Sequence, residues 1–176
     1  HKTKALVVMH YGGYPCDMKK ILYLQKKYKF LLIEDACHAM FSNYKNQKLG
    51  SFGNFSSFSF YANKNITCGE GGMLYCKNLQ DAKRARLLKS HGLNRSSFFH
   101  YNNFKNKYDV LESGFNYRLD DVRASFASSQ LKRVNKNNFK RYKLFMEYNK
   151  NLKNNKKIWI TFQNYKKNKC SRHLYT

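Results

Sequence analysis

Two short apolar runs, separated by a helical pattern, limit what this chain can fold into. Residues 5–9 read ALVVM and residues 30–33 read FLLI, so each run is continuous and of strand length. Continuous runs are typical of parallel strands that are buried on both faces of a sheet. Between the runs, Asp17 can cap a helix, and the order strand, helix, strand predicts a right-handed βαβ unit. We expect the inward face of that helix to carry Met18, Ile21, Leu22 and Tyr28.

The second run ends at two acidic residues, Glu34 and Asp35, and His38 follows shortly after them. Ligands of open α/β sheets bind outside the carboxyl ends of the strands. We therefore expect Asp35 at the mouth of a ligand site. An aspartate taken alone is more often a turn residue or a helix cap, so this prediction depends on the residues that follow.

A stretch rich in serine and aromatic residues comes next. Residues 55–61, FSSFSFY, show the alternation that is typical of a half-buried strand. Lys64 follows in a turn-prone Asn-Lys-Asn context, ahead of a glycine turn at residues 69–72. A partly desolvated lysine amine can form an imine with an aldehyde, and pyridoxal phosphate (PLP) commonly uses this chemistry. PLP also requires a carboxylate beside its pyridine nitrogen and donors around its phosphate, roles that Asp35 and Ser59 can fill.

Three ordered segments carry a resemblance to a known family: EDACHA at residues 34–39, the whole of residues 44–73, and GFNYRLDDVRASFASSQLKRV at residues 114–134. They resemble the DegT/DnrJ/EryC1/StrS aminotransferases, which are PLP-dependent sugar aminotransferases of fold type I. The resemblance implies an α/β fold with a mostly parallel, mixed sheet flanked by helices. It also implies that residues 1–152 form the second part of the large PLP-binding domain and that residues 153–176 begin a small C-terminal domain.

The resemblance also implies roles for individual residues. Lys64 matches the lysine that holds the cofactor covalently and moves the proton, and Asp35 matches the aspartate paired with the pyridine nitrogen. His38 matches the residue that lies against the cofactor ring near its phenolic oxygen, and Ser59 matches the hydroxyl on the cofactor phosphate. Asn116 matches an asparagine that reaches a phosphate across the interface of a homodimer with shared active sites.

The function implied by the resemblance is amino transfer, with glutamate as the expected donor, to a nucleotide-linked keto sugar in the biosynthesis of cell-surface polysaccharide or a related glycan. Arg118 is expected to face an anionic ligand. One alternative is a PLP-dependent sugar dehydratase of the same superfamily, which often has histidine in place of Lys64. The family's N-terminal portion, which binds phosphate and stacks on the cofactor ring, would precede His1, so we expect this chain to be a fragment.

The chain is strongly basic, with a formal net charge of +24. This charge would attract any polyanion, so a non-catalytic module that binds nucleic acid is a further alternative. The lysines are spread through the chain among asparagines, which favours solvated faces over specific nucleic-acid binding. Five cysteines form no CxxC pair, which disfavours a disulfide framework or a structural metal site. No apolar run reaches the roughly 18 residues of a membrane span, and we expect a cytoplasmic protein.

Further elements are expected along the rest of the chain. Strands are expected at residues 73–76, 158–162 and 173–175. A long loop is expected at residues 93–109. Helices are expected over residues 79–90, with Asn78 as the cap, over residues 119–134, and then through Phe139, Tyr142, Met146 and Leu152.

Overall fold

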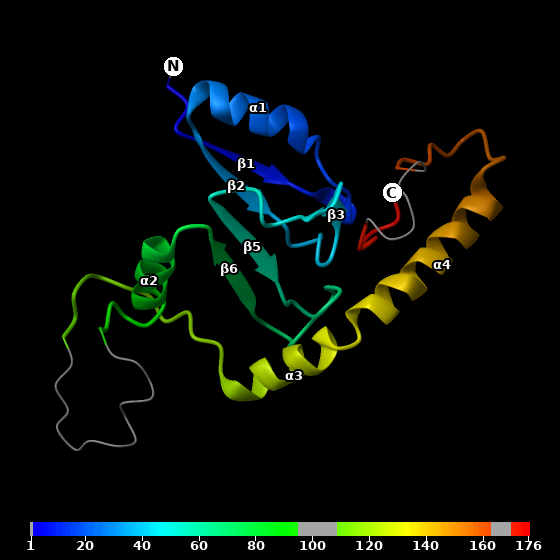
Figure 1. Ribbon diagram of the computed structural model, residues 1–176. Helices are drawn as coiled ribbons and strands as arrows, with labels where there is room; N and C mark the ends of the chain where they lie inside the picture. Colours follow the sequence, from blue (N-terminus) through cyan, green and yellow to red (C-terminus); the bar gives the residue numbers. More distant parts are fainter. Residues whose placement is uncertain (1, 95–108, 163–169) are drawn as a thin grey trace. The chain divides into compact units, whose positions relative to one another are not determined.

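The computed structural model of the protein describes residues 2–94, 109–162 and 170–176 (Figure 1). The chain forms two compact units, one from His1–Tyr75 with Asp121–Thr176 and the other from Cys76–Asp120. The second unit carries the helix α2 (Leu79–Leu88).

In the described part of the chain, the main sheet has four strands, β1 (Ala5–Met9), β2 (Leu31–Asp35), β5 (Phe55–Ser59) and β6 (Gly72–Cys76), in that order across it. β1 pairs in parallel with β2, and β2 pairs in parallel with β5. β6 runs in the direction opposite to β5 in Figure 1, so the sheet is mixed and mostly parallel. The predicted α/β class is confirmed.

The helix α1 (Met18–Tyr28) leads from β1 to β2 and completes the predicted βαβ unit. Asp17 caps it as predicted, because its Oδ1 accepts a hydrogen bond from Lys20 N at 3.3 Å. Met18 is fully buried in a core cluster with residues of β1 and β2. The prediction that Tyr28 faces inward is wrong, since this residue is 42% exposed. It lies about 80° around the helix from Met18, beyond the buried face.

One face of β1 and β2 is covered in the described part of the chain. Leu32 is fully buried, whereas Leu31 is 48% exposed and Val7 is 63% exposed. The prediction that both strands are buried on both faces is therefore wrong for these residues. The reason is that α1 packs on the face that carries Leu32, and successive side chains of a strand point to opposite faces.

Glu34 in β2 is a fully buried carboxylate, and the turn before β5 closes over it. Its Oε1 accepts hydrogen bonds from the backbone amides of Phe52 and Gly53, both at 2.7 Å. Its Oε2 accepts another from the amide of Gly50 at 2.8 Å. A buried charge needs such partners, because leaving it unpaired is costly.

His10, just after β1, completes the donors around Glu34. The imidazole is fully buried and its Nδ1 accepts a hydrogen bond from Cys16 N at 3.2 Å, so the proton on Nε2 is donated to Glu34 at 3.0 Å. Burial opposes ionisation, but the four hydrogen bonds hold the pKa of Glu34 below its usual value. The carboxylate thus joins the end of β1 to the turn that follows the hairpin of β3 (Asn43–Tyr44) and β4 (Gln47–Lys48).

Helices α3 (Asp121–Leu131) and α4 (Val134–Leu152) lie where helices were predicted. Of the residues that indicated α4 by their spacing, Phe139 is 40% exposed and Met146 is 46% exposed. Phe145 is buried instead, because its face of the helix packs against the C-terminal segment of the chain. None of the helices in the described residues is long and apolar enough to cross a membrane.

The C-terminal region lacks the strands that were predicted there. Neither residues 158–162 nor residues 173–175 form a strand. Phe162 and Arg172 have positive φ angles of 55° and 46°, and this left-handed conformation interrupts an extended chain. Residues 170–173 are instead buried, in the unit that also contains α4.

In the second unit, Asn78 caps α2 as predicted, because its Oδ1 accepts a hydrogen bond from a first-turn amide at 2.8 Å. The helix ends at Leu88, two residues before the predicted end. Gly92 has a positive φ of 71°, and a Cβ atom there would collide with the carbonyl of Glu112. Most of the loop predicted at residues 93–109 lies outside the described residues.

Replacing Glu34 tests how much the four hydrogen bonds to its buried carboxylate stabilise the fold. Glu34→Gln should lower the free energy of unfolding by about 2 kcal/mol, because an amide has one acceptor oxygen and its NH₂ group would face a backbone N–H. The carboxylate contributes its stability above its unfolded pKa, near 4.5, and loses it as pH falls through the lower pKa of the folded state. Thermal unfolding at pH 7 and pH 4 measures both effects, with the exposed Glu70→Gln as the control. Equal melting temperatures for the two variants at pH 7 would refute this role.

Candidate active site

Three of the predicted site residues lie at or just beyond the carboxyl ends of neighbouring parallel strands. Asp35 ends β2 and Ser59 ends β5, and the register places Asp35 opposite Ser57. Lys64 lies just beyond β5 in an irregular turn, where its amide donates a hydrogen bond to Tyr61 O at 3.0 Å. This edge of the sheet is where α/β folds bind their ligands.

His38 is partly buried, and three contacts hold its ring. Gly12 N donates a hydrogen bond to Nδ1 at 3.3 Å. The ring of Tyr11 contacts it edge-on with centroids 5.8 Å apart, and the ring of His173 lies 4.3 Å away by centroid. Because Nδ1 accepts a hydrogen bond, the neutral imidazole carries its proton on Nε2 and can donate it.

Lys64 and Asp35 both act electrostatically on His38. Burial lowers the pKa of His38, the Lys64 ammonium lowers it further, and the Asp35 carboxylate acts in the opposite direction. Such effects fall off with distance, so the charged groups of Lys64 and Asp35 lie within electrostatic range of the His38 ring. The carboxylate of Asp35 is oriented by a hydrogen bond from Cys37 N to its Oδ1 at 3.1 Å.

Ser59 sits beside the turn that carries Lys64. Its Oγ accepts a hydrogen bond from Tyr61 N at 3.3 Å. A serine hydroxyl that accepts one hydrogen bond can still donate its proton to an anionic oxygen. After Lys64 the chain folds back, with Cys68 N donating to Phe60 O at 3.0 Å, which holds the lysine near the end of β5.

Asn116 and Arg118 belong to the second unit, whereas the four other predicted site residues belong to the first. Both are exposed, and Asn116 Oδ1 accepts a hydrogen bond from Arg118 Nε at 3.2 Å. Arg118 Nη2 also lies 3.4 Å from His91 Nε2. An exposed amide and guanidinium can both bind an anionic group. Within the described residues, no group of three or more His, Cys, Asp or Glu side chains is placed to hold a metal ion.

Two buried residues beside the site were not predicted, Asn65 and His173. They are 7% and 8% exposed, and Asn65 Oδ1 lies 2.9 Å from His173 Nδ1. Burial lowers the pKa of His173 to about 4, and the nearby His38, Lys64 and Arg141 lower it as well. The two residues are 108 positions apart, and no spacing pattern in the sequence links them.

Comparison with known proteins identifies the family of this chain. Residues 1–176 match the DegT/DnrJ/EryC1/StrS aminotransferase family. The UDP-4-amino-4,6-dideoxy-N-acetyl-beta-L-altrosamine transaminase of Campylobacter jejuni is 38% identical over 172 residues, which cover 97% of this chain and 43% of that protein.

Solved structures share the fold. Helicobacter pylori PseC, an aminotransferase involved in the biosynthesis of pseudoaminic acid, has a TM-score of 0.87 and 32% identity, over 99% of this chain and 45% of that one. The PLP form of Spr1654 from Streptococcus pneumoniae has a TM-score of 0.78 and 26% identity, over 99% of this chain and 47% of that one. The chain thus spans less than half the length of each of these proteins. It belongs to the DegT/DnrJ/EryC1/StrS aminotransferase family.

Proposed function

We propose that the protein is a PLP-dependent aminotransferase that transfers an amino group, with glutamate as the expected donor, to a nucleotide-linked keto sugar. The observation that carries the proposal is the position of Asp35 at the carboxyl end of β2 and of Lys64 just beyond β5, where both act electrostatically on His38. Family membership supports the reaction type. The names of the Campylobacter jejuni transaminase and of PseC support an amino-sugar product that enters glycan biosynthesis.

The residues at this edge fit PLP by their chemistry. Lys64 offers an amine for the aldehyde, Asp35 a carboxylate for the protonated pyridine nitrogen, and Ser59 a hydroxyl for the phosphate. The PLP form of Spr1654 supports the same cofactor. When bound, PLP supplies an electron sink for the carbanion that forms at the donor's α-carbon.

Each side chain has a separate task in this proposal. Asp35 keeps a proton on the pyridine nitrogen through charge pairing. The Lys64 amine holds the cofactor and, once released, moves a proton to and from the substrate carbon. His38, neutral and protonated on Nε2, packs on the ring and donates a hydrogen bond. Asn116 reaches a phosphate in the partner subunit's site, and Arg118 faces an anionic part of the substrate.

A sugar dehydratase of the same superfamily is the second candidate. A histidine at position 64 could move protons but could not hold the cofactor covalently. Lys64 therefore favours amino transfer. No described feature favours the dehydratase reaction.

Isotope transfer separates the two reactions. The full-length protein, purified and supplied with PLP, [¹⁵N]glutamate and a UDP-linked keto sugar, should produce a ¹⁵N-amino sugar and an equal amount of 2-oxoglutarate. Lys64→Arg keeps the positive charge but removes the nucleophilic amine, so its rate should fall by about 1,000-fold or more. The exposed Lys26→Arg serves as the control and should match the native rate. A deoxygenated sugar without ¹⁵N, measured by mass spectrometry, would identify a dehydratase instead.

The proposed homodimer can be tested by mixing two inactive variants. Lys64→Ala and Asn116→Ala should each have little activity, because each damages both sites of its own homodimer. Their mixture should recover about a quarter of the native rate, since about half of the dimers are hybrids with one intact site. Native mass spectrometry verifies the subunit exchange. Hybrids that form without any recovery would rule out a site shared in this way.

A further inference from the structure

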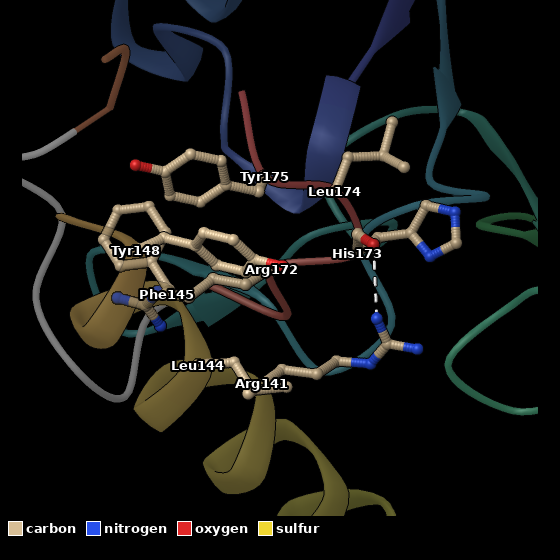
Figure 2. Close-up of a pocket in the computed structure, with 8 residues that line it drawn as sticks. All are labelled: Arg141, Leu144, Phe145, Tyr148, Arg172, His173, Leu174 and Tyr175. Carbon is tan, nitrogen blue, oxygen red and sulfur yellow. Dashed lines mark hydrogen bonds between the residues drawn. The ribbon is translucent and has the colours of Figure 1, made fainter. Parts of the chain in front are cut away.

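His173 is held in a buried segment that lies against the loop after β1. Its backbone amide donates a hydrogen bond to Gly12 O at 2.8 Å, and its carbonyl accepts one from Arg141 Nη1 at 3.2 Å (Figure 2). Figure 2 shows the imidazole turned away from the aromatic ring of Phe145. The ring contacts His38 instead, with centroids 4.3 Å apart and an angle of 35° between the planes.

A chain of side-chain amides fixes which nitrogen of His173 carries the proton. Asn138 Nδ2 donates to Met40 O at 3.3 Å, so the Oδ1 of Asn138 is free to face Asn65 and accepts its Nδ2 at 2.8 Å. Asn65 Nδ2 also donates to Ser171 O at 3.0 Å. Its Oδ1 therefore faces His173, and Nδ1 of His173 must be the donor across their 2.9 Å contact.

The backbone of Gly12 binds the imidazole of His38 and the main chain of His173. Its N–H donates to His38 Nδ1 at 3.3 Å, and its carbonyl accepts from the backbone amide of His173 at 2.8 Å. His38 is thereby fixed with its proton on Nε2, and His173 with its proton on Nδ1. The contact between the tilted rings and the shared backbone of Gly12 make the two histidines one unit.

Burial and nearby cations favour the neutral form of both rings. Burial, Lys64 and Arg141 lower the pKa of His173, and burial and Lys64 lower that of His38, while Asp35 acts on His38 in the opposite direction. A second proton on either ring would be repelled by Lys64. On His38 it would occupy Nδ1 and break the hydrogen bond from Gly12 N.

We propose that His173 is a positioning residue: held by Asn65, its ring keeps the His38 imidazole in the orientation in which Nδ1 accepts from Gly12 N and Nε2 carries the proton, and it ties that ring to the turn that carries Lys64. Asn65 directly follows Lys64 in the chain, so one network fixes the position of both groups. The hydrogen bond from His38 Nε2 to the phenolic oxygen on the ring of PLP rests on the proposed function. The geometry of the two imidazoles does not rest on it.

The test uses the cofactor-free protein, with ¹⁵N-labelled histidine and NMR that distinguishes Nδ1 from Nε2. In the native protein, His38 should keep its proton on Nε2 and have a pKa below the ordinary value of 6.5. His173 should keep its proton on Nδ1 and have a pKa of about 4. In the His173→Phe and Asn65→Ala variants, the His38 ring is no longer held in place, so its NMR signal should show exchange between tautomers. The titration midpoint of His38 should rise toward 6.5, because the ring becomes less buried. Tyr175→Phe, which removes a hydrogen bond to Asn149 from the same segment, should leave His38 unchanged.

If His173 and Asn65 serve only the stability of the fold, both variants should melt at a lower temperature, but the tautomer and the titration midpoint of His38 should remain as in the native protein. That result in a folded variant overturns the proposal. If neither variant folds, the native spectrum decides, because His38 with its proton on Nδ1 contradicts the network directly. If the native protein shows the expected tautomer and lowered pKa of His38 but does not bind PLP, the proposed function is refuted and the positioning of His38 by His173 stands.

Discussion

The buried carboxylate of Glu34 is the interaction on which the rest of the site depends. It accepts hydrogen bonds from His10 and from three amides of the turn before β5, so one side chain fixes the ends of two strands. Each donor must be in place, because an unpaired buried carboxylate would cost several kcal/mol. Asp35 is the next residue, and in a strand it must point to the opposite face. The inward anchor of Glu34 therefore aims Asp35 at the site.

The same arrangement sets the charges of the site. Lys64 and Asp35 are the ionisable groups that act on His38, and a second imidazole, His173, lies against it. The pKa values of both imidazoles lie below the ordinary value of histidine, so both rings are neutral at neutral pH. Each ring gains a charge only when the pH falls to its lowered pKa. In the proposed site, a neutral His38 does not compete with the protonated pyridine nitrogen for the Asp35 carboxylate. This separation of roles is what the proposed reaction requires.

Local chemistry predicted the elements that depend on neighbours in sequence. The caps at Asp17 and Asn78, the βαβ unit and the position of Asp35 at a strand end all follow from short patterns, and the structure confirms them. Other features depend on contacts between distant segments. The C-terminal segment, where two strands were predicted, packs against Phe145 of α4 instead of forming strands. The pairing of Asn65 with His173 spans 108 positions and leaves no local signal.

Lys64 is the residue proposed to bind PLP. Incubation of the purified full-length protein with PLP, reduction with borohydride and mass spectrometry of the peptides locates the attachment directly. We expect a stoichiometric pyridoxyl group on Lys64 and none on the exposed lysines of α1 at the same PLP concentration. Modification spread over exposed lysines, with Lys64 left unmodified, would contradict this assignment.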